Sequence, residues 1–154
     1  MGSLVAGAGV NSADQRWPWW PLLPLYPYGR RRTLFCELIP GQLWSLEQLQ
    51  GVYYVAVPIR LTVVKVSGGL MLVNPLPPTR ELLTAIAALE QQHGPVRSIV
   101  LPTASGLEHK LPLGPLARAF PDAEVWVWPW AVEFSAAVAF GLAGCSGQAH
   151  QSSS

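Results

Sequence analysis

The chain is short of charge and of cysteine. Only 12% of its 154 residues are Asp, Glu, Lys or Arg, and the formal net charge at pH 7 is +1. A chain with so little positive charge has no broad basic field for a phosphate backbone, so the composition argues against nucleic acid as a partner. The two cysteines, Cys36 and Cys145, lie far apart without a C-x-x-C spacing, which indicates neither a zinc knuckle nor a disulfide framework.

Long apolar runs are missing too. Gly and Pro interrupt every apolar stretch before it reaches the roughly 18 residues of a membrane-crossing helix, so no transmembrane segment is predicted. The first six residues have neither the basic flank of a secretory peptide nor a myristoylation signal, and they indicate no compartment. Hydrophobic residues nevertheless make up 50% of the chain. We therefore expect apolar surface that a second copy or a missing second half of the protein would cover.

Composition divides the chain into four segments. Residues 1–16 are small and polar and are expected to form a disordered lead, while residues 131–154 are expected to form a weakly structured or disordered tail. Residues 17–33 alternate proline with Trp and Tyr, which favours an extended arm. Residues 34–130 carry the strand and helix patterns of one domain.

The arm has two interpretations. Its aromatic rings pack over the apolar face of its own domain, or residues 17–32 contact a membrane surface through Trp, Tyr and the three consecutive arginines Arg30, Arg31 and Arg32. We favour the first interpretation, because three arginines alone make a weak membrane anchor.

Runs of β-branched residues alternate with helical patterns along the domain. Strands are predicted at residues 52–57, 60–66, 70–73, 98–101 and 123–128, with a break at Pro58 and a turn at Gly68 and Gly69. Thr79 is the expected N-cap of a helix that ends before Gly94, and a shorter apolar segment at 112–120 is the second helix. Residues 34–50 have no clear pattern. A hairpin or meander followed by strand, helix and strand predicts an α/β fold with a mixed sheet.

Glu108 and His109 stand at the end of a small-residue loop that follows the predicted strand at 98–101. Functional groups of α/β proteins gather at the carboxyl ends of strands, so this pair is the candidate site. The two side chains would act as an acid/base pair or a partial metal site. The structural alternative is that both tie the loop down by hydrogen bonds to backbone groups or to the arginines of the arm. His93, in the last turn of the first helix, is expected to interact with the helix dipole instead of a ligand.

The loop also carries a resemblance. The element order and residues 103–109 resemble the first half of the metallo-β-lactamase fold, whose members carry T-H-x-H-x-D-H after this strand. Thr103 and His109 match that motif, and Glu108 replaces its aspartate. Ala104 and Gly106 stand where two zinc ligands would be, and Asn74 takes the place of a frequent aspartate.

Three further segments resemble an uncharacterised family of that superfamily, found in photosynthetic organisms and recognised by a domain of unknown function. They are the arm at 17–33, V-P-I-R-L-T-V-V at 57–64 and G-L-E-H-K at 106–110. This resemblance implies the N-terminal half of a metallo-β-lactamase-like αββα sandwich, truncated before its second half. It also suggests a cytoplasmic or plastid location.

The resemblance implies a function only in outline. A catalytic zinc takes about three protein ligands and a water, whereas this loop keeps one histidine and one acid. We therefore expect a catalytically degenerate structural or interaction protein on a metallo-hydrolase-like scaffold. The alternative is a metal-dependent hydrolase with a reduced site made of Glu108 and His109, with zinc bound in a full-length form.

Overall fold

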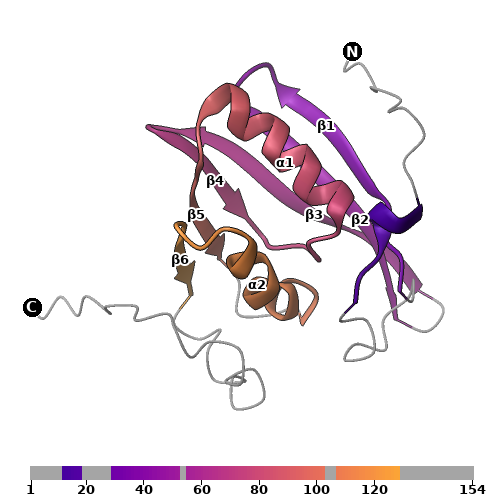
Figure 1. Cartoon of the computed structure of the whole chain (residues 1–154). Helices are drawn as coiled ribbons and strands as arrows, with labels where there is room; N and C mark the ends of the chain where they lie inside the picture. The colour runs from indigo at the N-terminus through magenta and orange to yellow at the C-terminus, as the bar shows by residue number, and fades with distance from the viewer. Residues whose placement is uncertain (1–11, 19–28, 53–54, 103–106, 129–154) are drawn as a thin grey trace, which may run out of the picture.

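The computed structural model describes residues 12–18, 29–52, 55–102 and 107–128, which form a six-stranded sheet and two α-helices (Figure 1). The elements are the 3-10 helix η1 (Ser12–Gln15), the strands β1 (Thr33–Ile39), β2 (Leu43–Val52), β3 (Val55–Val66) and β4 (Gly69–Val73), the helix α1 (Arg80–His93), β5 (Val96–Leu101), α2 (Leu107–Ala119) and β6 (Glu124–Val127). The strands lie in chain order across the sheet. Strands β1 to β4 are antiparallel neighbours, and β5 and β6 continue parallel to β4. The predicted α/β fold with a mixed sheet is confirmed.

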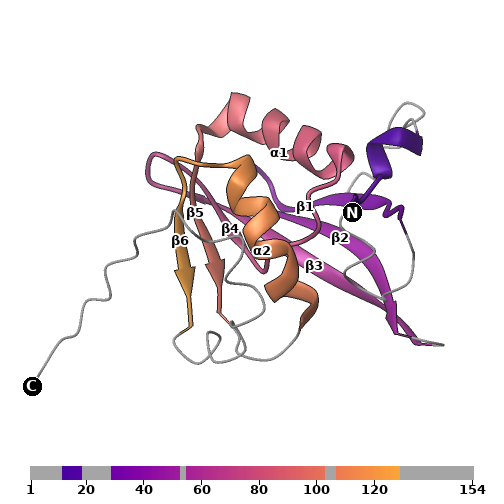
Figure 2. The same cartoon turned by 60° about the horizontal axis from the view of Figure 1, so that its bottom comes forward.

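Both α-helices cover the same face of the sheet (Figures 1 and 2). Alternate residues of each strand point toward them and form one apolar core. The most buried of the core side chains are Leu46, Leu61, Val63, Leu70, Leu72, Leu76, Leu82, Ile86, Ile99 and Leu116. Each fully buried aliphatic side chain stabilises the fold by roughly 1.5–3 kcal/mol, so this one-sided core fixes which face of each strand is inner.

Strand β3 runs through Pro58, where the sequence predicted a break. Pro58 pairs with Leu49 of β2, while β4 pairs with β3 only from Thr62 to Val66. At Pro58 the other side of β3 therefore has no neighbouring strand among the described residues. A residue without an N–H is tolerated at such an edge, which is why the prediction of a break was wrong.

Residues 34–50, for which no structure was predicted, form β1 and most of β2. The two strands are joined by a tight turn at Gly41, whose φ of 63° is left-handed. Gln42 N–H closes this turn on the carbonyl of Ile39 at 3.0 Å.

Helix α2 begins five residues earlier than the predicted apolar segment. It includes Pro112 and Pro115, each of which removes one backbone donor from the helix. The buried side chains of Leu113 and Leu116 hold it against the core in spite of that loss. Glu108 therefore lies in the first turn of a helix and not in a loop, and so does its neighbour His109.

The beginning of the described chain is folded onto the domain. Residues 12–16, expected within a disordered lead, form η1 and an antiparallel bridge between Arg16 and Arg30. Trp17 N–H donates to the Gly29 carbonyl at 3.0 Å, and its side chain is only 1% exposed. We call residues 12–18 and 29–32 the N-terminal strap.

Other predictions lie outside the described residues. They concern residues 1–11 of the lead, the arm at 19–28, Tyr53 and Tyr54, the loop at 103–106 and the tail at 131–154. Within the part of the chain that the structure describes, no helix is long and apolar enough to cross a membrane.

Candidate functional site

His109 lies beyond the carboxyl ends of β4 and β5, in the first turn of α2. Its Nδ1 is 3.0 Å from the backbone carbonyl of Pro75. Because a carbonyl only accepts hydrogen bonds, Nδ1 is the donor, and Nε2 of the neutral ring carries the free lone pair. The structural interpretation of His109 predicts a hydrogen bond of this kind to a backbone group. The bond does not use Nε2, which is the atom that the catalytic interpretation requires.

Asn74 connects β4 to this histidine. Its φ of 62° is left-handed, a conformation that Asn adopts more readily than other side chains, and its N–H donates to the Val100 carbonyl at 3.0 Å. Its side-chain Oδ1 is buried and has no hydrogen-bond partner in the part of the chain that the structure describes. The acceptor without a donor and the unusual backbone mark the turn at Asn74 and Pro75 as part of the candidate site. Only the family resemblance had pointed to Asn74.

Glu108 and His109 do not converge on a common point. Adjacent positions of an α-helix point in different directions, since only residues three or four apart share a face. Among the described residues, no three His, Cys, Asp or Glu side chains lie close enough together to hold a metal ion. A catalytic zinc needs about three protein ligands, so the residues in view do not fit one. Thr103, Ala104 and Gly106 lie outside the described residues.

His93 is placed as a packing residue. It lies in the last turn of α1, and its ring centroid is 4.8 Å from that of Trp44. The Trp44 Nε1–H donates to Glu37 Oε1 at 3.0 Å.

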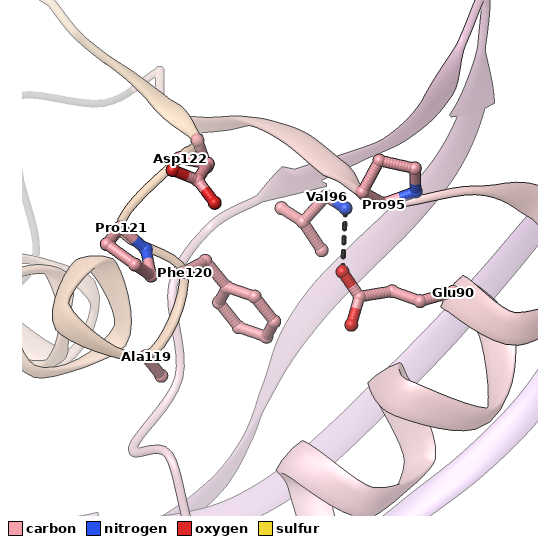
Figure 3. Close-up of a pocket in the computed structure, with 8 residues that line it drawn as sticks. Glu90, Pro95, Val96, Ala119, Phe120, Pro121 and Asp122 are labelled. Atoms are coloured by element: carbon pink, nitrogen blue, oxygen red, sulfur yellow. Dashed lines mark hydrogen bonds between the residues drawn. The ribbon is translucent and has the colours of Figure 1, made fainter.

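A cavity of about 220 Å³ lies at the opposite end of the parallel strands (Figure 3). It is bounded by the end of α1, the start of β5 and the connection from α2 to β6. Glu90 and Asp122 border it from two sides, and Glu90 Oε1 already accepts a hydrogen bond from Val96 N–H at 2.8 Å. The cavity is smaller than the 300–1,000 Å³ of typical ligand sites and is remote from His109, so it adds nothing to the candidate pair.

Sequence reasoning missed a buried polar cluster between the strap, β2 and the start of α1. Gln48 Nε2 donates to Thr33 Oγ1 at 3.1 Å and to the Pro77 carbonyl at 3.0 Å. Arg31 Nη1 donates to Gln50 Oε1 at 3.0 Å, and burial lowers the pKa of the Arg31 guanidinium to about 10. Apolar alternation gave no signal for this cluster, because the inner positions of β2 change from Trp44 and Leu46 to the polar residues Gln48 and Gln50.

The outer face of the sheet carries no helix of the described chain, and we call it the helix-free face. By strand register, this face carries every strand residue whose side chain points away from the core. Its exposed large apolar residues on the strands are Leu34, Ile39, Leu49 and Trp126, and Trp128 follows two residues after the last of them. The half-buried Val64, Met71, Val73 and Val100 lie between these groups. An apolar face of this kind was expected from the composition, but its location was not.

A comparison with protein families supplies one match. A family model described as a domain of unknown function (DUF4336) matches residues 40–152, well over half of the chain. The matched range contains β2 to β6 and both α-helices, together with Asn74, Glu108 and His109. No curated protein matches the chain.

Proposed function

The chain belongs to the DUF4336 family of domains of unknown function, and we propose that it is a non-catalytic structural or interaction domain that pairs with a second copy through its helix-free face. In this proposal the domain corresponds to one αβ half of a metallo-β-lactamase-like αββα sandwich. A second sheet packs face to face on the first, at the usual spacing of about 10 Å.

The observation that carries this proposal is the apolar character of the helix-free face. Trp126 is 59% exposed and Leu34 is 52% exposed, with half-buried aliphatic residues between them. A large aromatic side chain has 150–250 Å² of surface, so the two tryptophans alone present roughly 200 Å². The whole face reaches several hundred Å², on the order of the largest patches that monomers leave exposed. Surfaces of this size on soluble proteins usually mark an interaction site.

Charge favours a second copy as the occupant. With a net charge of +1, two chains repel each other very little. On the helix-free face, Arg60 Nη2 lies 2.6 Å from Glu47 Oε1, so these two charges neutralise each other within one chain. The other outward positions paired between β3, β4 and β5 are uncharged, since Thr62 and Ser98 lie among Val64, Met71, Val73 and Val100. Such a face can pair with a copy of itself across a twofold axis without burying a further charge.

The test is sedimentation equilibrium on the purified chain. The wild type is expected to form a dimer in the micromolar range, and Trp126→Lys is expected to weaken it at least about tenfold, because a charge would be buried between the sheets. Val57→Lys is the matched control. Val57 is 48% exposed but has an inner register position, at the projecting end of β3. A wild type that stays monomeric at roughly 100 µM, or an equal effect of both substitutions in folded protein, would refute the proposal.

One observation favours a second candidate, a hydrolase that uses Glu108 and His109. The bond from Nδ1 to Pro75 fixes the tautomer in which Nε2 is a base. This candidate predicts hydrolysis of a generic ester or phosphoester that His109→Ala abolishes and the control His93→Ala leaves intact. Elemental analysis separates the two candidates further, since near-stoichiometric zinc lost in His109→Ala would overturn the non-catalytic proposal.

A further inference from the structure

We propose that the N-terminal strap forms a binding site for a phosphate-like oxyanion, with Trp17 and Arg31 as its donors. Two buried donors of this strap have no acceptor among the residues that the structure describes, the indole Nε1–H of Trp17 and the Nε–H of Arg31. Both side chains are only 1% exposed. This inference does not depend on the pairing of sheet faces.

The pairing of the strap segments places the two donors on one side. Arg16 lies opposite Arg30, so Trp17 lies opposite Gly29, and Arg31 lies opposite residue 15. Alternate residues of paired extended segments point to the same face, and diagonal neighbours are within reach of long side chains. Trp17 and Arg31 are such diagonal neighbours on the buried face, while Arg16 and Arg30 are exposed.

The chemistry of Arg31 calls for an anion. Within the described ranges, its guanidinium forms no ion pair, and its side-chain acceptor is the neutral amide oxygen of Gln50 at 3.0 Å. A buried charge without a counter-ion is costly, and a guanidinium satisfies it best with an oxyanion held by two parallel N–H donors. The edge of Arg31 that carries Nε is the edge without an acceptor among the described residues.

The charges around the strap favour the same ligand class. Arg16, Arg30 and Arg32 add three further cations to it. The two nearby carboxylates already have partners, since Asp14 lies 3.6 Å from Arg80 and Glu81 Oε2 accepts Thr33 N–H at 2.8 Å. The strap is therefore net positive around two unfilled donors, which attracts small anions. A phosphate group has the size and the several acceptor oxygens that this arrangement requires, and it can come from a soluble phosphate or from a lipid headgroup.

The experiment measures the thermal and urea stability of the full chain in inorganic phosphate and in chloride at equal ionic strength. Phosphate is expected to stabilise the wild type. Two substitutions are each expected to weaken phosphate binding on the order of tenfold. Trp17→Phe keeps an aromatic ring but removes the donor. Arg31→Lys keeps the charge but loses the planar fork. Arg30→Lys is the matched control, because its side chain is exposed on the other face of the strap.

A second arm distinguishes the two sources of the phosphate group. Phosphatidylcholine vesicles with and without phosphatidic acid are sedimented with the same variants. Retention only with phosphatidic acid, lost in Trp17→Phe, assigns the site to a headgroup, whereas stabilisation by inorganic phosphate alone assigns it to a soluble ligand. The proposal is overturned if neither probe acts on the wild type, or if Trp17→Phe and a folded Arg31→Lys bind as Arg30→Lys does.

Discussion

Replacing Arg31 by methionine should stabilise the folded chain in buffer without phosphate. Arg31 is fully buried, and burial lowers the pKa of its guanidinium to about 10, well below its ordinary value. Since one pKa unit corresponds to 1.36 kcal/mol, the folded state bears a cost of roughly 3 kcal/mol for keeping this charge. Methionine fills a similar volume without a charge, but it leaves the buried oxygen of Gln50 without its donor, which costs about 1 kcal/mol. The net expectation for Arg31→Met is a gain of about 2 kcal/mol at neutral pH.

The gain in unfolding free energy from Arg31→Met should depend on pH, and measuring this dependence tests the burial cost. Below pH 10, Arg31 is protonated in both the folded and the unfolded state, so the burial cost is fully present. Above about pH 10, the folded state releases the proton while the unfolded state keeps it, and the unfolding free energy of the wild type therefore rises relative to the variant. Urea unfolding at pH 7 and at about pH 10.5 should show the difference between the two proteins beginning to close. Arg30→Met, at an exposed position, should change stability by less than about 0.5 kcal/mol at either pH. A methionine variant less stable than the wild type, or a difference that does not depend on pH, would refute the reasoning.

Three further predictions follow from packing and capping and can be checked by urea unfolding. Gly69→Ala should destabilise the fold by about 3 kcal/mol, because an added Cβ would collide with a backbone carbonyl of the α1–β5 connection. Gly41→Ala is the control. Its Cβ would meet nothing within 4 Å, so it should cost only about 1 kcal/mol for the left-handed φ. Thr79→Ala should cost about 1 kcal/mol through loss of the N-cap of α1, and Thr79→Ser should restore most of it. Leu61→Ala should cost roughly 3 kcal/mol as a core deletion, and Leu49→Ala on the helix-free face should cost well under 1 kcal/mol in the monomer.

Elements with local signals were predictable from the sequence. The turn between β3 and β4 needs a left-handed residue, and Gly68 supplies it with φ of 80°. Helix α1 begins where Thr79 Oγ1 accepts the N–H of Leu82 at 3.3 Å and ends at Gly94, as capping chemistry requires. Each of these features depends on residues within a few positions of one another.

Strands β1 and β2 lacked such a local signal. Their inner positions change from Trp44 and Leu46 to Gln48 and Gln50, so apolar alternation stops halfway along β2. Gln48 is tolerated inside because it donates to Thr33, 15 residues away, and to the Pro77 carbonyl, 29 residues away. No periodicity in the sequence announces partners at those distances.

The candidate site also depends on contacts between residues that are far apart in the sequence. For this reason the sequence alone could not reveal the function. His109 acquires its tautomer from the carbonyl of Pro75, 34 residues earlier, and it does so from a helical turn that only tertiary packing of α2 stabilises. Apolar layers follow from local periodicity, whereas polar side chains are satisfied by partners that the fold brings together. Among the described residues, the buried side-chain atoms without a hydrogen-bond partner lie on Trp17, Arg31, Gln48 and Asn74. They are therefore the places where a group from outside the described chain has the most free energy to contribute.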